Sequence, residues 1–156
     1  MWDVLLNLTD AVQALDLVRA LRTSNWAYPI LNAAHVAGIG LLFGAIAVAD
    51  VAILRRGRLD RAADALPVRI ALVGFALATA TGLVLFAVRA SAYAQNPFMG
   101  IKFGLIALAG ANALLLRWVA SRSAPQHCSV RQRMAAGASL AIWTAAIGSG
   151  RMIGFW

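Results

Sequence analysis

Four long apolar stretches constrain the fold of this chain more than any other feature. A helix rises ~1.5 Å per residue, so about 20 residues cross a hydrocarbon layer of ~30 Å. Apolar residues make up 62% of the chain and only one acid, Asp50, lies inside these stretches. We therefore expect one all-α domain, residues 24–156: a polytopic membrane four-helix bundle of two antiparallel hairpins. Its spans should cover about residues 27–54, 66–90, 98–118 and 134–155.

The first 23 residues follow a different pattern. Apolar side chains recur at helical spacing, while aspartate, asparagine and glutamine fall on another face. This predicts an amphipathic helix over residues 1–23 that lies at the membrane interface. Packing on the bundle or on a partner is the alternative. The apolar positions are Leu5, Leu8, Val12, Leu15 and Val18.

The formal charge of +8 could suggest a nucleic-acid partner. The basic residues instead flank the apolar stretches, so we expect a lipid bilayer as partner and no nucleic acid. By the positive-inside rule, both long loops are cytoplasmic and both termini periplasmic or extracellular, in a bacterial inner (plasma) membrane. Nine basic residues lie on the loop side (Arg55, Arg56, Arg58, Arg61, Arg69, Arg117, Arg122, Arg131, Arg133) against five on the other (Arg19, Arg22, Arg89, Lys102, Arg151).

Two further patterns concern helix packing. Residues 49–55 align with 111–117, so that Asp50 corresponds to Asn112, as expected of two hairpins related by a parallel repeat. Chance matching in Ala/Leu-rich sequence is the alternative. Small residues also recur at four-residue spacing and are predicted to face other helices. They are Gly40 and Gly44, Gly74 with Ala78 and Gly82, Gly100 and Gly104, and Gly150 and Gly154.

His35 is the leading candidate for a functional group inside the membrane, where ionisable side chains are costly. Tyr28 and Asn32 precede it by seven and three residues, which places all three on one helix face. Basic side chains on the other helices lie at a similar depth, and their convergence would build a cationic pocket at the outer side. They are Arg89, Lys102 and Arg151.

Several ligands suit such a pocket. Haem b could be ligated by His35, with the basic residues holding its propionates, and a quinone headgroup could hydrogen-bond to His35. A copper site would use His35 with Met99 or Met152, and the same methionines could supply a sixth haem ligand. Lipid phosphates bound by the basic side chains are the alternative without a cofactor. His127 and Cys128 lie in a cytoplasmic loop and form no metal motif by themselves.

Asp50 lies near the inner end of the first span. We expect it to form a polar clasp between helices with Asn112 and with Arg69 or Arg117. A proton path from Asp50 to His35 is the more specific alternative. The two residues are separated by roughly 22 Å along the helix.

Short elements distributed along the chain carry a family resemblance. They are the stretch from His35 to Gly44, then Asp50, Gly74-Phe75, Thr81-Gly82, Asn96-Pro97-Phe98 with Lys102, Asn112, and Gly150-Arg151. These elements resemble an uncharacterised family of small bacterial four-helix inner-membrane proteins, which is distantly similar to the membrane domain of copper resistance D-type proteins. The resemblance implies a four-helix fold with metal, haem or redox association at His35, Asp50, Lys102 and Arg151. The chain lacks the additional histidines of four-helix b-type cytochromes.

The leading hypothesis is thus a membrane module that binds a small ligand or cofactor around His35. It would act as a homo-oligomer or as a subunit of a membrane redox complex. No nucleotide loop, catalytic triad or paired carboxylates appear in the sequence, which favours a protein that is not an enzyme. Transport along a path from His35 to Asp50, or a purely structural role, are the alternatives.

Overall fold

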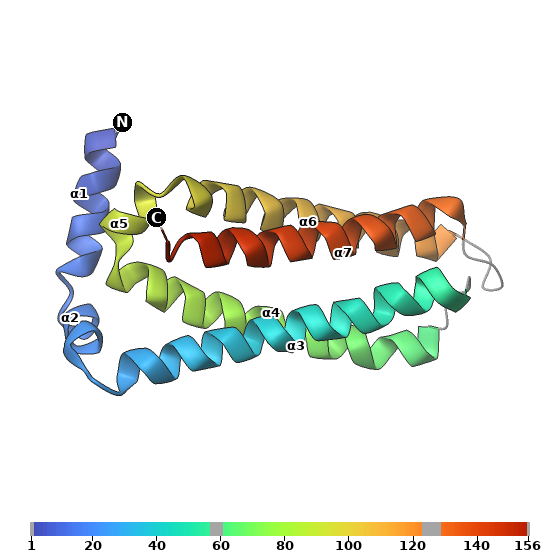
Figure 1. Ribbon diagram of the computed structural model, residues 1–156, viewed down its shortest axis with the longest axis horizontal. Coiled ribbons are helices and arrows are strands. Elements are labelled where there is room, and N and C mark those ends of the chain that lie inside the picture. Colours follow the sequence, from blue (N-terminus) through green and yellow to red (C-terminus); the bar gives the residue numbers. More distant parts are fainter. Residues whose placement is uncertain (1, 57–60, 123–128, 156) are drawn as a thin grey trace.

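The computed structural model describes residues 2–56, 61–122 and 129–155 (Figure 1). Within these ranges the chain is helical and contains no strand, which confirms the all-α prediction. The helices are α1 (Trp2–Gln13), α2 (Asp16–Thr23), α3 (Ala27–Arg56), α4 (Arg61–Val88), α5 (Ala90–Ala94), α6 (Pro97–Arg122) and α7 (Val130–Met152).

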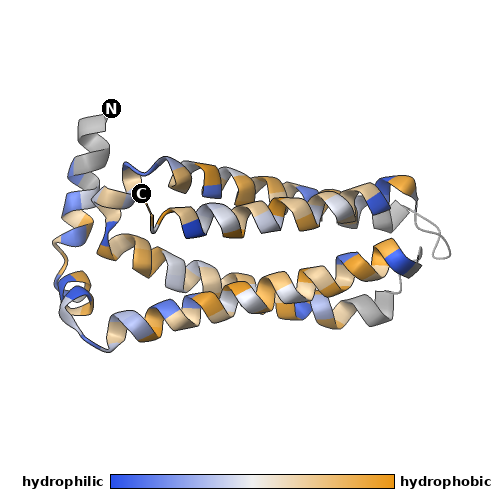
Figure 2. Cartoon of the chain, in the orientation of Figure 1, coloured by the Kyte–Doolittle hydropathy of each residue, from blue (hydrophilic) through white to orange (hydrophobic). Residues whose placement is uncertain are grey.

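Three of these helices are long and apolar enough to cross a membrane. The segments are Ala27–Arg55, Ala65–Val88 and Pro97–Leu116, within α3, α4 and α6. Many large apolar side chains on them remain exposed. Figure 2 shows that hydrophobic residues occupy most of the length of these helices. A lipid-facing surface has this character, because hydrocarbon rather than water then covers the side chains.

The fourth expected span corresponds to α7, which is less apolar than the other three and is not among the membrane-spanning candidates. One face of α7 carries mainly small residues and is buried in the protein. Neighbouring helices approach closely where side chains are small. The buried positions on α7 are Gln132, Ala135, Ala136, Ser139, Trp143, Ala146 and Ser149.

The long helices extend beyond the expected spans at the arginine-rich end. α3 continues to Arg56, α4 begins at Arg61 and α6 continues to Arg122. The expected boundaries follow hydropathy, whereas arginine and alanine are good helix formers and continue a helix beyond the apolar segment.

The N-terminal segment forms two helices rather than one, and α1 lies across the ends of the long helices (Figure 1). The Ser91 hydroxyl, next to α1 in space, donates to Asp10 Oδ1 at 2.6 Å and accepts a hydrogen bond from Gln13 Nε2. Val18 of α2 is buried. The segment thus packs on the protein through α5 and α4.

The long helices associate mainly as two pairs. α3 packs along α4, α6 packs along α7, and the pairs meet where α3 contacts α7. A core cluster of Leu42, Ala109, Trp143 and Ala146 joins α3, α6 and α7. Both chain termini lie at the α5 end of the molecule (Figure 1).

Glycines bring α3 and α4 into backbone contact. A Cβ placed on Gly38 would lie 2.7 Å from the backbone nitrogen of Ala78, and one on Gly74 would lie 2.5 Å from that of Leu42. The predicted packing role therefore holds for Gly74. It does not hold within this chain for four other glycines, whose added Cβ would meet nothing within 4 Å: Gly40, Gly44, Gly100 and Gly104.

Candidate functional site

His35 is bound to α4 through one nitrogen of its ring. Its Nδ1 lies 2.9 Å from the carbonyl oxygen of Ala78 and 3.1 Å from Thr81 Oγ1. A carbonyl oxygen can only accept a hydrogen bond, so Nδ1 must carry the proton and donate. The Thr81 hydroxyl already donates to the carbonyl of Leu77 at 2.6 Å. It therefore acts as a second acceptor for Nδ1–H.

This arrangement determines the role of the other ring nitrogen. When Nδ1 of a neutral imidazole carries the proton, Nε2 presents a lone pair. Histidines that ligate metal or haem iron are commonly oriented in this way, by an Nδ1–H bond to a backbone carbonyl. His35 is thus held in the tautomer that a ligand requires.

Gly82 leaves the space that the imidazole occupies. A Cβ on Gly82 would lie 2.8 Å from His35 Cε1 and 3.3 Å from Nδ1. Only glycine allows the ring to approach α4 this closely. Ala78, Thr81 and Gly82 therefore form one seat for the ring of His35.

Among the predicted cations, Lys102 of α6 is the one whose charge acts on His35. It is partly buried, and its charge interacts with the imidazole. The side chain lies against α7, where a Cβ on Gly150 would be 3.3 Å from Lys102 Nζ. No acid occurs in the apolar parts of α6 or α7, so neither helix offers Lys102 a carboxylate of its own.

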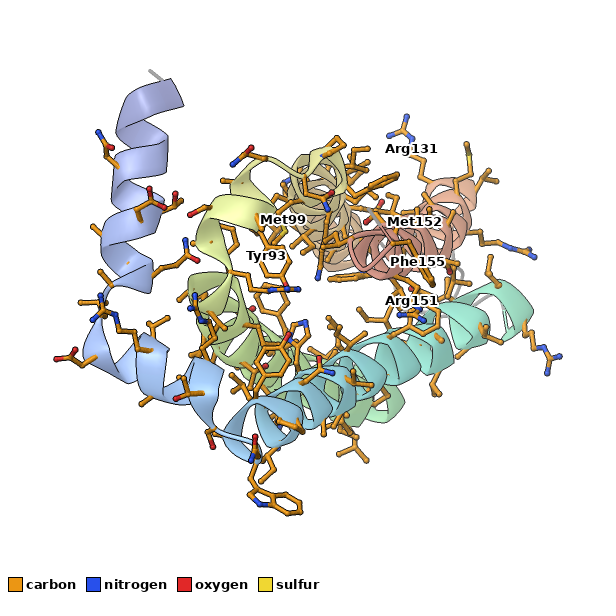
Figure 3. All side chains as sticks on the ribbon, turned by 60° about the vertical axis from the view of Figure 1, so that its left-hand side comes forward. Tyr93, Met99, Arg131, Arg151, Met152 and Phe155 are labelled. Atoms are coloured by element: carbon orange, nitrogen blue, oxygen red, sulfur yellow. The ribbon has the colours of Figure 1, made fainter. Side chains whose placement is uncertain are left out.

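Arg151 and Arg89 are exposed and lie nearer the end of the molecule. The Arg151 guanidinium stacks over the ring of Phe155, with its central carbon 4.6 Å from the ring centroid. Figure 3 shows Arg151, Met152 and Phe155 at the end of α7. It also shows Tyr93 of α5 and Met99 in the first turn of α6. The predicted cationic residues thus gather at one end, but only Lys102 is shown to interact with His35.

Tyr28 lies on α3 seven residues, or about two helical turns, before His35. It interacts with Tyr93 of α5. Burial raises the pKa of the Tyr93 phenol above its usual range. The neighbouring Tyr28, which is hydrogen-bonded to it, raises this pKa further, and Arg89 acts in the opposite direction. Asn32 is exposed. The two phenols therefore form a hydrogen-bonded pair between α3 and α5.

The metal-binding hypothesis depends on the available donors. The described part of the chain contains no group of three His, Cys, Asp or Glu side chains that could hold a metal ion. Met99 is partly buried on α6 and Met152 is exposed on α7. His127 and Cys128 lie outside the described residues. Haem needs fewer protein donors than a bare copper ion, because its porphyrin supplies the equatorial ligands.

The structure places Ser139 of α7 beside Asp50, a contact that the predicted polar clasp did not include. Asp50 is hydrogen-bonded by Ser139 of α7, and Asn112 Nδ2 donates to the carbonyl of Ala135 at 2.9 Å. Arg69 is exposed, and the side chain of Arg117 lies outside the described residues. Asp50 and Asn112 thus each contact α7 rather than one another.

The sequence did not identify Thr81 as a contact of His35 or Ser139 as a contact of Asp50. Thr81 and Ser139 each lie on a helix face that carries small residues, which gives a weak signal for close packing. Nothing in one sequence shows which helix such a face meets. Tyr93, which lies between the second and third expected spans, belongs to α5.

No protein-family model, curated protein or solved structure matches this chain.

Proposed function

We propose that this chain is an integral membrane protein in which α7 forms a fourth crossing beside α3, α4 and α6. The location of both termini at one end supports an even number of crossings (Figure 1). The excess of arginine at the opposite end then makes the two long connections cytoplasmic and the termini periplasmic, in a bacterial inner membrane. In this arrangement α3–α4 and α6–α7 are two hairpins related by a duplication.

The function that the geometry supports best is binding of a small cofactor by His35 near the outer face. The observation that carries this proposal is the bond from His35 Nδ1 to the Ala78 carbonyl, which leaves Nε2 as the ligating or accepting atom. At this depth the unprotonated Nε2 requires either a hydrogen-bond donor or a metal centre as its partner.

Lys102 adds a preference for anionic groups. A partly buried ammonium group on helices without acids is stabilised by an anion from elsewhere. Haem b meets both requirements, because Nε2 can bind its iron and Lys102 can bind a propionate. When bound, haem would supply one-electron redox chemistry. A quinone headgroup could accept a hydrogen bond from Lys102 through its carbonyl oxygen. It could donate a hydrogen bond to the Nε2 lone pair only in its reduced form, which carries hydroxyl groups.

The sequence places one histidine, His35, within the expected spans. Met99 or a second protein chain would supply any further protein ligand to a bound haem. We therefore propose that the protein acts in an assembly, as a homo-oligomer or as one subunit of a larger redox complex. The resemblance to small four-helix membrane proteins and to copper resistance D-type domains supports the same class of function.

Transport along a line from His35 to Asp50 has less support. Between these residues α3 contributes Leu42, Phe43 and Ile46 to the apolar core with Trp143 and Ala146. A continuous polar path would have to avoid this cluster.

Absorption spectroscopy of the full chain, purified in mild detergent from cells supplied with a haem precursor, tests the proposal. The sharpest variant is His35→Asn, whose side-chain amide can still donate to the Ala78 carbonyl but has no equivalent of Nε2. We expect a Soret band in the wild type, its loss in His35→Asn, and its retention in Asn32→Ala on the same helix. A colourless wild-type protein without co-purifying quinone would contradict the proposal.

A further inference from the structure

The inner half of the contact between α3 and α7 contains a second unusual group, separate from the His35 site. Asp50 is only 3% exposed, and its Oδ2 atom is buried without a hydrogen-bond partner. A buried carboxylate without a cation or sufficient donors is costly, and more so in a membrane. The state of this group therefore requires an explanation.

The described surroundings offer Asp50 little compensation. Ser139 provides one hydrogen bond from α7. Arg133 of α7 donates through Nη2 to the carbonyl of Leu54 of α3 at 3.1 Å. On the helices packed around this region, the described arginines are exposed: Arg55 on α3, Arg69 on α4, and Arg131 and Arg133 on α7.

A second buried group near the inner end also lacks a partner. Gln132 is 0% exposed and its Nε2 is without a hydrogen-bond acceptor. Its Oε1 accepts from the backbone N–H of Ser129 at 2.7 Å in a capping box, which fixes the side chain at the start of α7. Gln132 and Ser139 lie on the same buried face of α7, about 10 Å apart along the helix axis.

We propose that Asp50 is a proton-binding site inside the helix bundle, and that protons reach its Oδ2 from the inner aqueous side past Gln132. Proton uptake converts the carboxylate to a neutral carboxylic acid with the new O–H bond on Oδ2, which removes the buried charge. Release returns the same proton. In this proposal, ordered water between Gln132 Nε2 and Asp50 Oδ2 satisfies both groups, as buried water does at other polar sites, and provides the path for the proton.

A proton fits this site better than a metal cation. Hard metal cations such as Mg²⁺ and Ca²⁺ require several oxygen ligands. The described contacts place only the Ser139 hydroxyl on the Asp50 carboxyl, while Asn112 is directed to the Ala135 carbonyl through its amide nitrogen. A proton needs a single acceptor, and Oδ2 is that acceptor.

Infrared spectroscopy of the full-length protein in lipid nanodiscs tests this proposal, because the C=O stretch of a protonated carboxyl is separate from carboxylate bands and shifts in D₂O. We expect such a band in mildly acidic buffer and its replacement by carboxylate absorption as the pH rises. The band should be absent in Asp50→Asn and retained in Asp16→Asn, an exposed acid on α2. A band that persists in Asp50→Asn, or no band in the wild type, would overturn the proposal.

Two more variants keep the test decisive if Asp50→Asn does not fold. Ser139→Ala retains the acid but removes its hydrogen bond, so the band should remain and move in frequency. Gln132→Leu should slow hydrogen–deuterium exchange of the band several-fold. An unchanged frequency in Ser139→Ala would show that this carboxyl is not Asp50, and unchanged exchange in Gln132→Leu would contradict the proposed route. Loss of the band on addition of sodium at constant pH would instead identify a metal-cation site and overturn the assignment of a proton.

Discussion

The Nδ1 atom of His35 on α3 lies 2.9 Å from the carbonyl oxygen of Ala78 on α4. Ala78 also lies against Gly38, one helical turn from His35, where an added Cβ would be 2.7 Å from the Ala78 nitrogen. The close approach of the two backbones therefore brings the carbonyl within reach of the imidazole. The packing of α3 on α4 and the orientation of His35 are one structural feature.

Gly74 should be essential for this packing. Gly74→Ala places a Cβ against the backbone of Leu42 and Gly38, which cannot move as a flexible side chain can. We expect a loss of stability of about 1–3 kcal/mol, as for other overpacked sites. Thermal unfolding in detergent measures it. The matched control is Gly44→Ala, where nothing lies within 4 Å; equal destabilisation by both would contradict the packing account.

Gly82 should affect the cofactor more than the fold. Gly82→Ala directs a Cβ at His35 Cε1, so the imidazole must leave its seat while the α3–α4 crossing at Gly74 remains. The variant should unfold near the wild-type temperature and purify with much less bound cofactor. Gly100→Ala, with open space around it, should keep wild-type cofactor content. Full occupancy in Gly82→Ala would show that the ring of His35 does not need this seat.

Asn96 should connect the beginning of α6 to the end of α7. Its Oδ1 accepts from the backbone N–H of Phe98 at 3.0 Å, and its Nδ2 lies 3.4 Å from the carbonyl oxygen of Ile153. Pro97 follows in the first helical position, which proline favours. Asn96→Ala should cost about 1 kcal/mol through loss of the cap. Asn96→Asp keeps the acceptor, so in unfolding measurements it should cost less; the reverse order would contradict a capping role.

Tyr93 should ionise at higher pH than an exposed tyrosine. Burial and Tyr28 raise its pKa, so folding favours the neutral phenol. The corresponding stability is fully present below the pKa of the unfolded chain and is lost as the pH rises through the raised pKa. Ultraviolet titration of phenolate measures this shift. Tyr28→Phe leaves Tyr93 as the only tyrosine and should lower its titration midpoint; a midpoint that stays or rises would contradict the assigned contact.

The proposed orientation can be tested independently of any cofactor. A reporter active only in the periplasm should be active when fused after residue 156 and silent when inserted in the connection at residues 123–128. The excess of arginine at the inner ends is the physical reason. The opposite pattern would reverse the topology and place His35 toward the cytoplasm.

The sequence was informative about helices and much less about their contacts. Hydropathy located the centres of α3, α4 and α6, because a membrane-length apolar run has few alternatives. The four-residue glycine pattern grouped Gly74, which meets a backbone, with Gly40 and Gly44, which do not, and it omitted Gly38, which does. That distinction depends on the rotation of each helix, which one sequence does not specify when the whole helix surface is apolar.

The same contrast between recognisable residues and unpredictable contacts applies to the candidate site. His35 could be singled out because an imidazole within an apolar run is rare. Its partners Ala78 and Thr81 lie 43 and 46 residues away and have ordinary side chains. Asp50 was likewise recognised from its charge, whereas its contact Ser139 depends on how α7 is placed against α3.

Native mass spectrometry tests the central claim, that His35 holds a small cofactor, most directly. Wild-type protein released from detergent should carry the additional mass of one small molecule per chain or per oligomer, identifiable as haem b or a quinone after dissociation. His35→Asn, whose side-chain amide can still donate to the Ala78 carbonyl, should be released without it. A wild-type protein that carries no additional mass, or a His35→Asn protein that retains the same molecule at the same occupancy, would contradict the account.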